Sequence, residues 1–294
     1  MQILTGKEVA EKVYETLQSD CNAFVEKYGF PPTLAVVLVG NDPASQSYVQ
    51  GKKQACLSLG FGHRDYHLAQ TTSQKELLNL IHELNEDKTV HGILVQMPLP
   101  AHLDADTVIQ NIKVEKDVDG FHPQNVGNLL IGKHGFVSCT PLGVLQILDY
   151  YGIPVEGKHV VVLGRSNIVG KPMASLLMQK GRDATVTVCH SKTENLTSIT
   201  VQADILIAAI GKPLFVTESM VKEGCIVIDV GINRVEDASR KRGYRLVGDV
   251  DYEHVAPHCK AITPVPGGVG VMTIAMLMKN TMQAALQLAQ KETQ

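Results

Sequence analysis

The stretch that decides the fold reads VVVLGRSNIVGKP and covers residues 160–172. Its apolar start is typical of a buried strand, which breaks at Gly164 and gives way to a helix near Pro172. Such a strand–glycine–helix turn presents backbone N–H groups and a positive helix end to a phosphate. The middle glycine of the common G-x-G-x-x-G motif is absent, so an ordinary structural turn remains the alternative.

A second predicted strand, residues 185–189, is followed by His190, Ser191 and Lys192. In NAD-binding units an acidic residue near this point holds the ribose 2′-hydroxyl. No acid stands here, and Arg165 follows the glycine of the first turn. Hydrogen-bond donors and cations suit a 2′-phosphate, so the pattern favours NADP over NAD. The alternative is a polar surface loop after the strand.

Composition sets the class of protein. The 294 residues are enough for two α/β domains, and 44% hydrophobic with 19% charged residues is typical of a globular protein. A net charge of −3 argues against a general nucleic-acid surface.

We expect no secretory signal and no membrane span. The six cysteines form no C-x-x-C pair, and most lie inside apolar stretches, which favours reduced, buried thiols in a cytoplasmic protein. Two histidine pairs lack a third ligand, so no metal site is expected; they are His63/His67 and His254/His258.

The first half of the chain alternates between strand and helix patterns. An amphipathic helix is expected over residues 6–28. Strands are expected at 34–39, 63–68 and 91–96, and helices at 44–59, 73–85 and 104–112. This βαβαβ order predicts a parallel sheet.

A second α/β unit follows a helix at 142–150. Its strands are expected at 159–163, 185–189, 204–209, 226–230 and 245–247, with helices at 172–180 and 217–222. The last helix, about 270–290, is long enough to return to the first domain. The predicted fold is therefore α/β with a discontinuous domain, residues 1–140 and 270–294, and a Rossmann-like nucleotide-binding domain, residues 141–269, with a cleft between them.

A second group of residues carries chemical interest. Tyr48 and Lys52 lie one turn apart on the predicted helix, and Lys52 shares its apolar stripe. The alternative is a lysine whose stem passes the core to reach solvent. Gln96 ends a predicted strand, and Asp119 precedes a glycine in a turn, where an acid is usually solvated. We expect these four side chains to line one cleft. Tyr-x-x-x-Lys also occurs in short-chain dehydrogenases, but there it follows the nucleotide turn rather than preceding it.

Five segments in one order strongly resemble the bifunctional methylenetetrahydrofolate dehydrogenase/methenyltetrahydrofolate cyclohydrolase family. They are Tyr48-x-x-x-Lys52, VQMPLP at 95–100, KDVDG at 116–120, GRS at 164–166 and PVPGGVG at 264–270. The resemblance implies NADP-dependent oxidation of 5,10-methylenetetrahydrofolate and hydrolysis of the methenyl product to 10-formyltetrahydrofolate. It also implies a homodimer with the active site between each subunit's two domains. Val271 and Ser138 depart from the family pattern, since proline is usual at both positions, and this affects local loop geometry.

The resemblance also implies roles for individual residues. Lys52 handles protons during hydrolysis, Gln96 orients it, and Tyr48 positions the reacting end of the substrate. Asp119, with Pro264 and Gly268, binds the substrate. The cofactor is expected at Gly164, Arg165, Ser166, His190, Ser191 and Ile232.

Three other functions stay open at this point. One is a monofunctional NAD(P)-dependent methylenetetrahydrofolate dehydrogenase. Another is an amino-acid or shikimate-type dehydrogenase, whose two-domain layout is similar. The third is a non-catalytic nucleotide-binding regulator, which the presence of Lys52 and Asp119 disfavours.

A first test concerns the nucleotide. Arg165→Ala should weaken NADP binding by about 1.5–3 kcal/mol, the value of a hydrogen bond to a charged group. NAD lacks the 2′-phosphate, so its binding should change much less. Titration of the variant with each nucleotide measures both effects, and equal losses would contradict the assignment.

Overall fold

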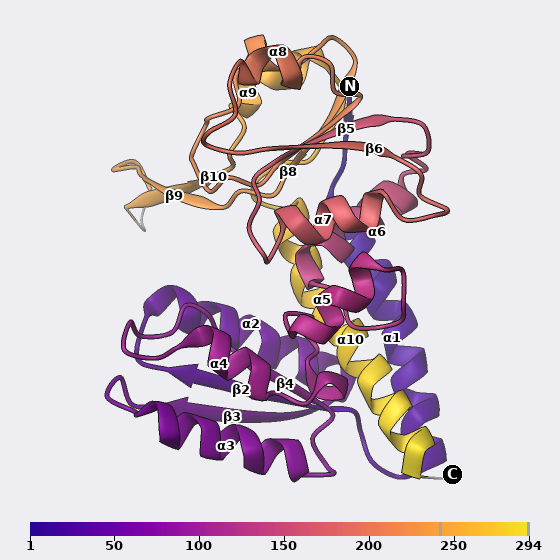
Figure 1. The fold of residues 1–294 in the computed structure, drawn as a ribbon, viewed down its shortest axis with the longest axis vertical. Coiled ribbons are helices and arrows are strands. Elements are labelled where there is room, and N and C mark those ends of the chain that lie inside the picture. The colour runs from indigo at the N-terminus through magenta and orange to yellow at the C-terminus, as the bar shows by residue number, and fades with distance from the viewer. Residues whose placement is uncertain (241–242, 293–294) are drawn as a thin grey trace. The chain divides into compact units, whose positions relative to one another are not determined.

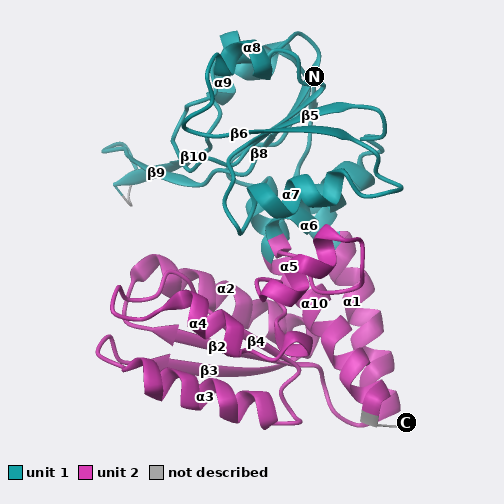
Figure 2. Cartoon of the chain, viewed as in Figure 1, with its two compact units in different colours: residues 1–11, 140–273 teal, residues 12–139, 274–294 magenta. Residues whose placement is uncertain are grey.

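A computed structural model describes residues 1–240 and 243–292 (Figure 1). The α/β chain divides into two compact units, each built from two segments (Figure 2). Residues 12–139 and 274–294 form the unit that contains a three-stranded sheet, and residues 1–11 and 140–273 form the unit that contains a six-stranded sheet. The boundaries at 11/12 and 273/274 fall inside long helices, α1 (Gly6–Tyr28) and α10 (Val269–Glu292), and the third, at 139/140, falls at the start of α6 (Cys139–Tyr150).

The three-stranded sheet confirms the predicted βαβαβ order. Its strands are β2 (Thr33–Val39), β3 (Gly62–Leu68) and β4 (Gly92–Val95), all parallel in the order β3-β2-β4. The helices α2 (Pro43–Leu59) and α3 (Gln74–Glu86) connect them, and α4 (Ala105–Asn111) follows β4.

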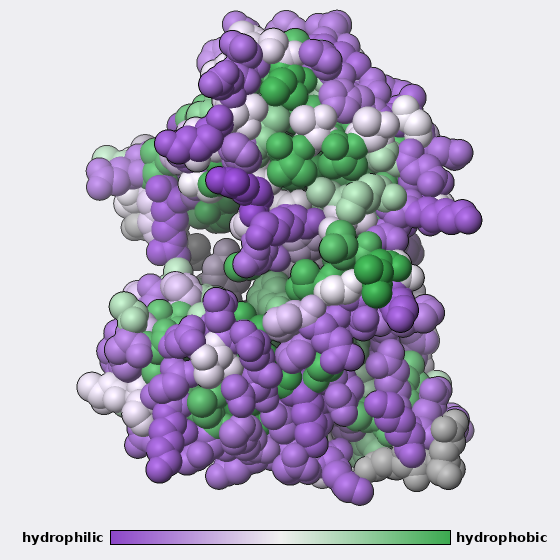
Figure 3. All heavy atoms as spheres, viewed as in Figure 1, coloured by the Kyte–Doolittle hydropathy of each residue, from purple (hydrophilic) through white to green (hydrophobic). Residues whose placement is uncertain are grey.

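Alternation along β2 builds the core of this unit. Ala35, Val37 and Val39 pack with Leu77 and Ile81 of α3 in one apolar cluster. Each large aliphatic side chain buried there stabilises the unit by roughly 1.5–3 kcal/mol. Hydrophilic residues cover most of this unit on the face shown in Figure 3. Apolar packing against α3 therefore stabilises the sheet. Polar side chains can gather at the carboxyl ends of its strands, where ligands of parallel sheets bind.

Local signals fix where the crossover helices begin and end. The Asp42 side chain accepts a hydrogen bond from Ser45 N at 2.7 Å at the start of α2, and Gly60 ends this helix with φ +73°. At α3 the predicted capping box is present, because Ser73 Oγ accepts from Glu76 N and Glu76 Oε2 accepts from Ser73 N.

The six-stranded sheet is also fully parallel. Its strands are β1 (Gln2–Ile3), β5 (His159–Leu163), β6 (Thr185–Cys189), β7 (Ile205–Ala208), β8 (Cys225–Asp229) and β11 (Cys259–Ile262). The spatial order is β1-β11-β8-β7-β5-β6. The order changes direction between β5 and β7, and ligands of such sheets bind outside the carboxyl ends of the strands at this switch point.

Some predicted elements need correction. The strand expected at 245–247 is β10 (Tyr244–Val247), which pairs antiparallel with β9 (Asn233–Glu236) in a separate two-stranded sheet. The helix expected at 217–222 is only a single 3₁₀ turn, Glu218–Met220. The strands β1 and β11 were not predicted, because two and four residues are too few to show a periodic pattern.

The remaining helices are short. They are α5 (Pro123–Leu130), α6 (Cys139–Tyr150), α7 (Gly170–Leu177), α8 (Leu196–Thr200) and α9 (Tyr252–Val255). Among the described residues, no helix is long and apolar enough to cross a membrane.

The capping box of α3 offers a test of the fold. Ser73→Ala removes the acceptor for Glu76 N and should lower the free energy of unfolding by about 1 kcal/mol, as measured by urea titration. Ser19→Ala, at an exposed position inside α1, is the matched control and should change it by less than about 0.5 kcal/mol. Equal changes in the two variants would show that the cap contributes nothing.

Candidate active site and nucleotide site

Lys52 is buried in the unit with the three-stranded sheet. The residues of α2 that face the core include Lys52, Ala55, Cys56 and Leu59, so the expected place of the lysine on the apolar stripe is confirmed. Only 9% of Lys52 is exposed. Its Nζ donates a hydrogen bond to Gln96 Oε1 over 2.8 Å. A lysine that passes the core to reach solvent would not make this contact, so the alternative is excluded.

Gln96 owes its place to β4. It directly follows this strand, and its backbone N–H continues the ladder to Val37 O at 2.8 Å. Its Nε2 donates to Met97 O at 2.7 Å, which leaves Oε1 turned toward Lys52. The amide therefore acts as a fixed acceptor for the lysine amine.

The turn with Asp119 runs beside the same strand. Asp117 forms an isolated parallel bridge with Ile93 of β4, which carries Asp119 toward the carboxyl end of the sheet. Gly120 then turns the chain with φ +71°, and a Cβ there would lie 2.6 Å from the carbonyl carbon of Val137. Only glycine fits this turn, because both its backbone angle and its close neighbour exclude a side chain.

Buried polar side chains hold this turn in place. Asp117 accepts hydrogen bonds from the backbone N–H groups of Phe121 and His122 and from Asn125 Nδ2. Asn280 of α10 donates to Val118 O at 2.8 Å and to Val137 O at 3.1 Å. Asn125 and Asn280 were not predicted. The available signal was the asparagine that interrupts the apolar sequence of α10.

Burial and charge shift the proton affinities of the pair. Burial lowers the pKa of Lys52 below its usual value, and the nearby Asp119 opposes this shift. Burial raises the pKa of Asp119 to about 6, with Lys52 opposing and Asp117 adding to the rise. Burial also raises the pKa of the neighbouring Cys139 thiol well above its usual value. The site thus combines an amine that loses its proton easily with a carboxyl that gains one easily, and its thiol stays neutral.

Tyr48 differs from this group in its exposure. It stands one turn before Lys52 on α2, and 47% of it is exposed. The expected spacing of one turn from Lys52 is present, but Tyr48 is exposed to solvent whereas Lys52 is buried. An exposed aromatic ring beside a buried amine can contact a flat ligand.

The glycine turn after β5 lies at the switch point of the six-stranded sheet. Gly164 has φ +121°, and a Cβ there would collide with the carbonyl oxygen of Ala209 after β7. A Cβ on Gly170 would collide with the carbonyl oxygen of Gly164. Ser166 Oγ accepts from Val169 N at 3.0 Å, which closes the turn. This cradle has room for backbone alone, as a close approach to a phosphate requires.

Arg165 and Ser191, which are expected to bind a 2′-phosphate, come just after two adjacent strands, β5 and β6. Leu163 and Cys189 are partners in the β5–β6 ladder, so Arg165 and Ser191 follow at the same edge of the sheet. Both side chains are exposed. Beside them, His190 N donates to Thr193 Oγ1 at 2.9 Å, and His190 Nδ1 accepts from Lys192 N at 3.2 Å.

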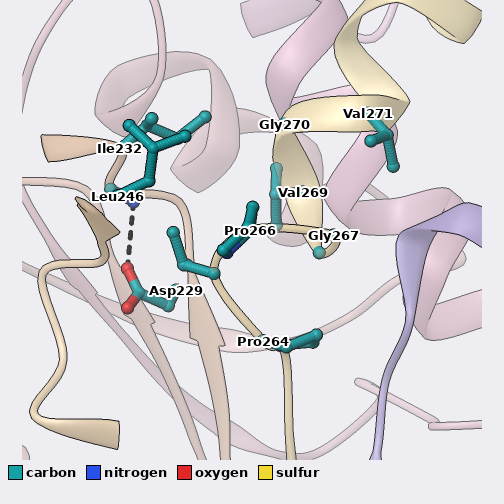
Figure 4. A pocket seen from close by; sticks show the side chains of 12 residues that line it. Asp229, Ile232, Leu246, Pro264, Pro266, Gly267, Val269, Gly270 and Val271 are labelled. Atoms are coloured by element: carbon teal, nitrogen blue, oxygen red, sulfur yellow. Dashed lines mark hydrogen bonds between the residues drawn. The ribbon is translucent and has the colours of Figure 1, made fainter. Parts of the chain in front are cut away.

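A cavity of about 100 Å³ brings together three further predicted residues of this unit (Figure 4). Ile232, Pro264 and Gly268 line it, together with Asp229 and Leu246. A Cβ on Gly270 would lie 2.6 Å from Ile232 Cδ1, so this glycine leaves room for the isoleucine. Val271, one of the two departures from the family pattern, also lines the cavity. The other, Ser138, is buried.

The two units define an α/β enzyme with a lysine-centred site and a nucleotide cradle. Two family models match the chain: "Tetrahydrofolate dehydrogenase/cyclohydrolase, catalytic domain" over residues 4–119, and "Tetrahydrofolate dehydrogenase/cyclohydrolase, NAD(P)-binding domain" over residues 138–289. The chain therefore belongs to the tetrahydrofolate dehydrogenase/cyclohydrolase family.

Full-length relatives agree with this assignment. The bifunctional protein FolD of Chlorobium phaeobacteroides is 56% identical over 288 residues, which cover 97% of this chain and 98% of the relative. The crystal structure of FolD from Campylobacter jejuni, a methylenetetrahydrofolate dehydrogenase/cyclohydrolase, has a TM-score of 0.93 and 50% identity, covering 98% of this chain and 99% of that one. The Trypanosoma brucei enzyme, solved with NADP cofactor and an inhibitor, has a TM-score of 0.92 and 39% identity, with 97% of each chain covered.

The raised pKa of Asp119 gives a pH-dependent test of the site. Between about pH 4 and 6 the unfolded chain has released this proton while the folded chain still holds it, so this carboxyl makes the free energy of unfolding fall as pH rises. Asp119→Asn should remove this fall and add about 2–3 kcal/mol of stability at pH 7 relative to pH 4. Thermal unfolding across pH measures the effect.

Asp20→Asn, at an exposed position on α1, is the matched control for this comparison. If Asp119→Asn and Asp20→Asn gave the same pH profile as the parent protein, the Asp119 carboxyl would not lie in a desolvated site.

Proposed function

We propose that this protein oxidises 5,10-methylenetetrahydrofolate to 5,10-methenyltetrahydrofolate with NADP⁺ and hydrolyses the methenyl product to 10-formyltetrahydrofolate. The observation that carries the hydrolysis is the buried hydrogen bond from Lys52 Nζ to Gln96 Oε1 at 2.8 Å, beside Asp119. The bifunctional relatives of similar length support both reactions.

Lys52 is proposed to handle the protons of hydrolysis. The methenyl substrate is a cation, and a neutral amine does not repel it. Burial lowers the pKa of Lys52, which favours the neutral form. As the water oxygen bonds to the methenyl carbon, Lys52 takes up a water proton. The bond from this carbon to N5 then breaks, the proton still held by the added oxygen passes to N5, and the formyl group remains on N10 while the first proton stays on Lys52. Gln96 keeps the amine oriented throughout.

Asp119 is proposed to anchor the folate. Its two oxygens match the paired N–H donors on the pyrimidine edge of the pterin, in a charge-assisted bidentate contact. The pKa of about 6 means that the carboxylate is ionised at neutral pH. Tyr48, exposed one turn from Lys52, stacks on the substrate and positions its reacting end. Pro264 and Gly268 complete the set of proposed substrate residues.

The oxidation needs orientation more than acid–base chemistry. NADP⁺, when bound, accepts a hydride from the methylene carbon, so no side chain has to move a proton. Gly164, Ser166 and the cradle around them are proposed to hold the phosphates, and Ile232 the nicotinamide end. Arg165, with His190 and Ser191, is proposed to hold the 2′-phosphate. The Trypanosoma brucei relative was solved with NADP, which supports this preference.

The two functions are proposed to divide along the chain as the sequence predicts. Residues 1–140 and 270–294 are proposed to bind and transform folate and residues 141–269 to bind NADP, with Pro264 and Gly268 as the two proposed substrate residues that lie in the second range. In the structure, residues 1–11 belong to the compact unit of the six-stranded sheet, through pairing of β1 with β11. The family resemblance supports a homodimer. The six cysteines are all buried and free, which supports a cytoplasmic location.

Replacing Lys52 tests the proposed hydrolysis. Lys52→Met keeps most of the side-chain volume and removes the amine, so the hydrolysis rate should fall by roughly 10²–10⁴-fold. Oxidation should fall less, because it needs no base, and methenyl product should accumulate. The measurement is methenyl formation and decay, followed by absorbance with purified proteins.

Lys53→Met is the control for this test. The Lys53 side chain is 41% exposed and pairs with Asp65 at 2.9 Å, away from Gln96. This variant should hydrolyse at close to the parent rate. A Lys52→Met protein that also kept the parent rate would refute the mechanism. A parent protein that formed methenyltetrahydrofolate without hydrolysing it would instead be a monofunctional dehydrogenase.

A further inference from the structure

Two buried carboxylates in the six-stranded unit have no role in the mechanism above. Asp229 ends β8 and is 3% exposed, and Asp249 follows β10 and is 0% exposed. Their four oxygens accept hydrogen bonds from the backbone N–H groups of Ile210, Gly211, Gly231, Asp249 and Val250 and from the Asn233 side chain. Every oxygen of the two carboxylates accepts at least one N–H group. Buried polar groups this well paired usually have a structural or functional role, so the reason for burying two acids here has to be found.

Asp249 holds the chain where it leaves β7. Its Oδ2 accepts from Ile210 N at 2.6 Å and from Gly211 N at 2.9 Å. This segment lies against the nucleotide cradle. Ala209, the residue before Ile210, places its carbonyl so close to Gly164 that a Cβ there would collide with it. Asp249 therefore fixes one wall of the switch point between β5 and β7.

Asp229 holds the chain where it leaves β8. Its Oδ1 accepts from Gly231 N at 3.0 Å and from Asp249 N at 2.9 Å, and its Oδ2 accepts from Val250 N at 3.0 Å. The first of these bonds fixes the turn that carries Ile232 into the cavity of Figure 4. The other two fix the backbone of Asp249 itself, so the two acids act as one unit.

The glycines around the pair give a second, independent observation. A Cβ on Gly231 would collide with the Asp249 carboxylate, and a Cβ on Gly248 would collide with the Asp229 carboxylate. Neither glycine has a positive φ, so each is needed for space rather than for backbone freedom. The backbone of both loops is thus packed directly on the two acids.

Stability alone does not account for the pair. Two buried carboxylates repel each other, and burial with the nearby Asp249 raises the pKa of Asp229 to about 7. Apolar residues at such positions are often as stabilising or more so. What the acids supply is a set of directed acceptors for the N–H groups of three separate loops.

We propose that Asp229 and Asp249 are positioning residues for the oxidation, which hold the loops after β7, β8 and β10 in the arrangement that binds the nucleotide. This inference rests on the proposed function, in which this unit binds NADP⁺. Hydrolysis of supplied methenyltetrahydrofolate consumes no nucleotide, so the two reactions of one protein separate a positioning effect from general damage.

The test uses Asp229→Asn and Asp249→Asn in the full-length protein. Each keeps the side-chain size but places an NH₂ group against an N–H donor. The KM for NADP⁺ should rise at least about tenfold in each variant, while the rate of hydrolysis of supplied methenyltetrahydrofolate stays within about twofold of the parent. Titration with NADP⁺ should show the same loss of affinity without any turnover.

Two further variants guard this test. Asn233→Ala removes one donor to Asp249 at a partly exposed position, keeps both acids, and should raise the KM for NADP⁺ about threefold. Asp204→Asn is the matched control, because Asp204 also accepts a backbone N–H, from His159 at 2.9 Å, but at the opposite ends of the same strands. It should leave the KM for NADP⁺ unchanged.

The possible results distinguish a failure of this inference from a failure of the proposed function. The inference is overturned if folded Asp229→Asn, Asp249→Asn and Asn233→Ala all bind NADP⁺ as the parent does. It is also overturned if oxidation and hydrolysis fall together, or if Asp204→Asn raises the KM as much as the others. A parent protein that did not reduce NADP⁺ at all would instead overturn the proposed function, and this inference with it.

Discussion

The candidate active site depends on keeping one lysine amine out of water. Burying an ammonium group is costly unless hydrogen bonds and a counter-charge compensate for the lost solvent. Gln96 supplies the hydrogen bond and Asp119 the charge. Each comes from a different segment, so α2, the end of β4 and the 117–120 turn must meet at one place. The parallel sheet provides that place, because its strands release their chains at a common edge.

This requirement explains polar residues that take no part in the reaction. The Asp119 turn is not a regular element, so side chains have to fix it. Asp117 gathers the N–H groups that follow the turn, and Asn280 ties the carbonyls of Val118 and Val137 to α10. Lys116 lies beside them, buried, with its Nζ donating to the carbonyls of Leu84 and Asp87 at the end of α3. Because these groups are satisfied internally, the turn gains a defined shape without exposing Asp119 fully to water.

The sequence predicts those parts of the molecule that have a periodic pattern or a local signal. The three-stranded sheet and the burial of Lys52 follow from spacing, and the capping box of α3 follows from Ser73 and Glu76. Other parts depend on pairing across long distances. β1 joins a sheet whose other strands begin at residue 159, and nothing in Gln2–Ile3 indicates its partner. Asp229 falls inside a predicted strand and Asp249 follows Gly248, and nothing in the sequence pairs them, so only the folded chain shows that both are buried together.

Buried charged side chains have different roles in the two units. In the three-stranded unit opposite charges adjoin. Burial shifts the pKa of both Lys52 and Asp119 toward their neutral forms while each partner opposes the shift of the other, and the result suits chemistry that moves protons. In the six-stranded unit like charges adjoin, and six N–H groups hold them. That arrangement suits a reaction whose main demand is geometry. The glycines also differ between the two sites. At the nucleotide edge Gly164, Gly231 and Gly248 make room for backbone and carboxylate atoms, so this edge is shaped by main chain. At the lysine site the side chains meet each other directly.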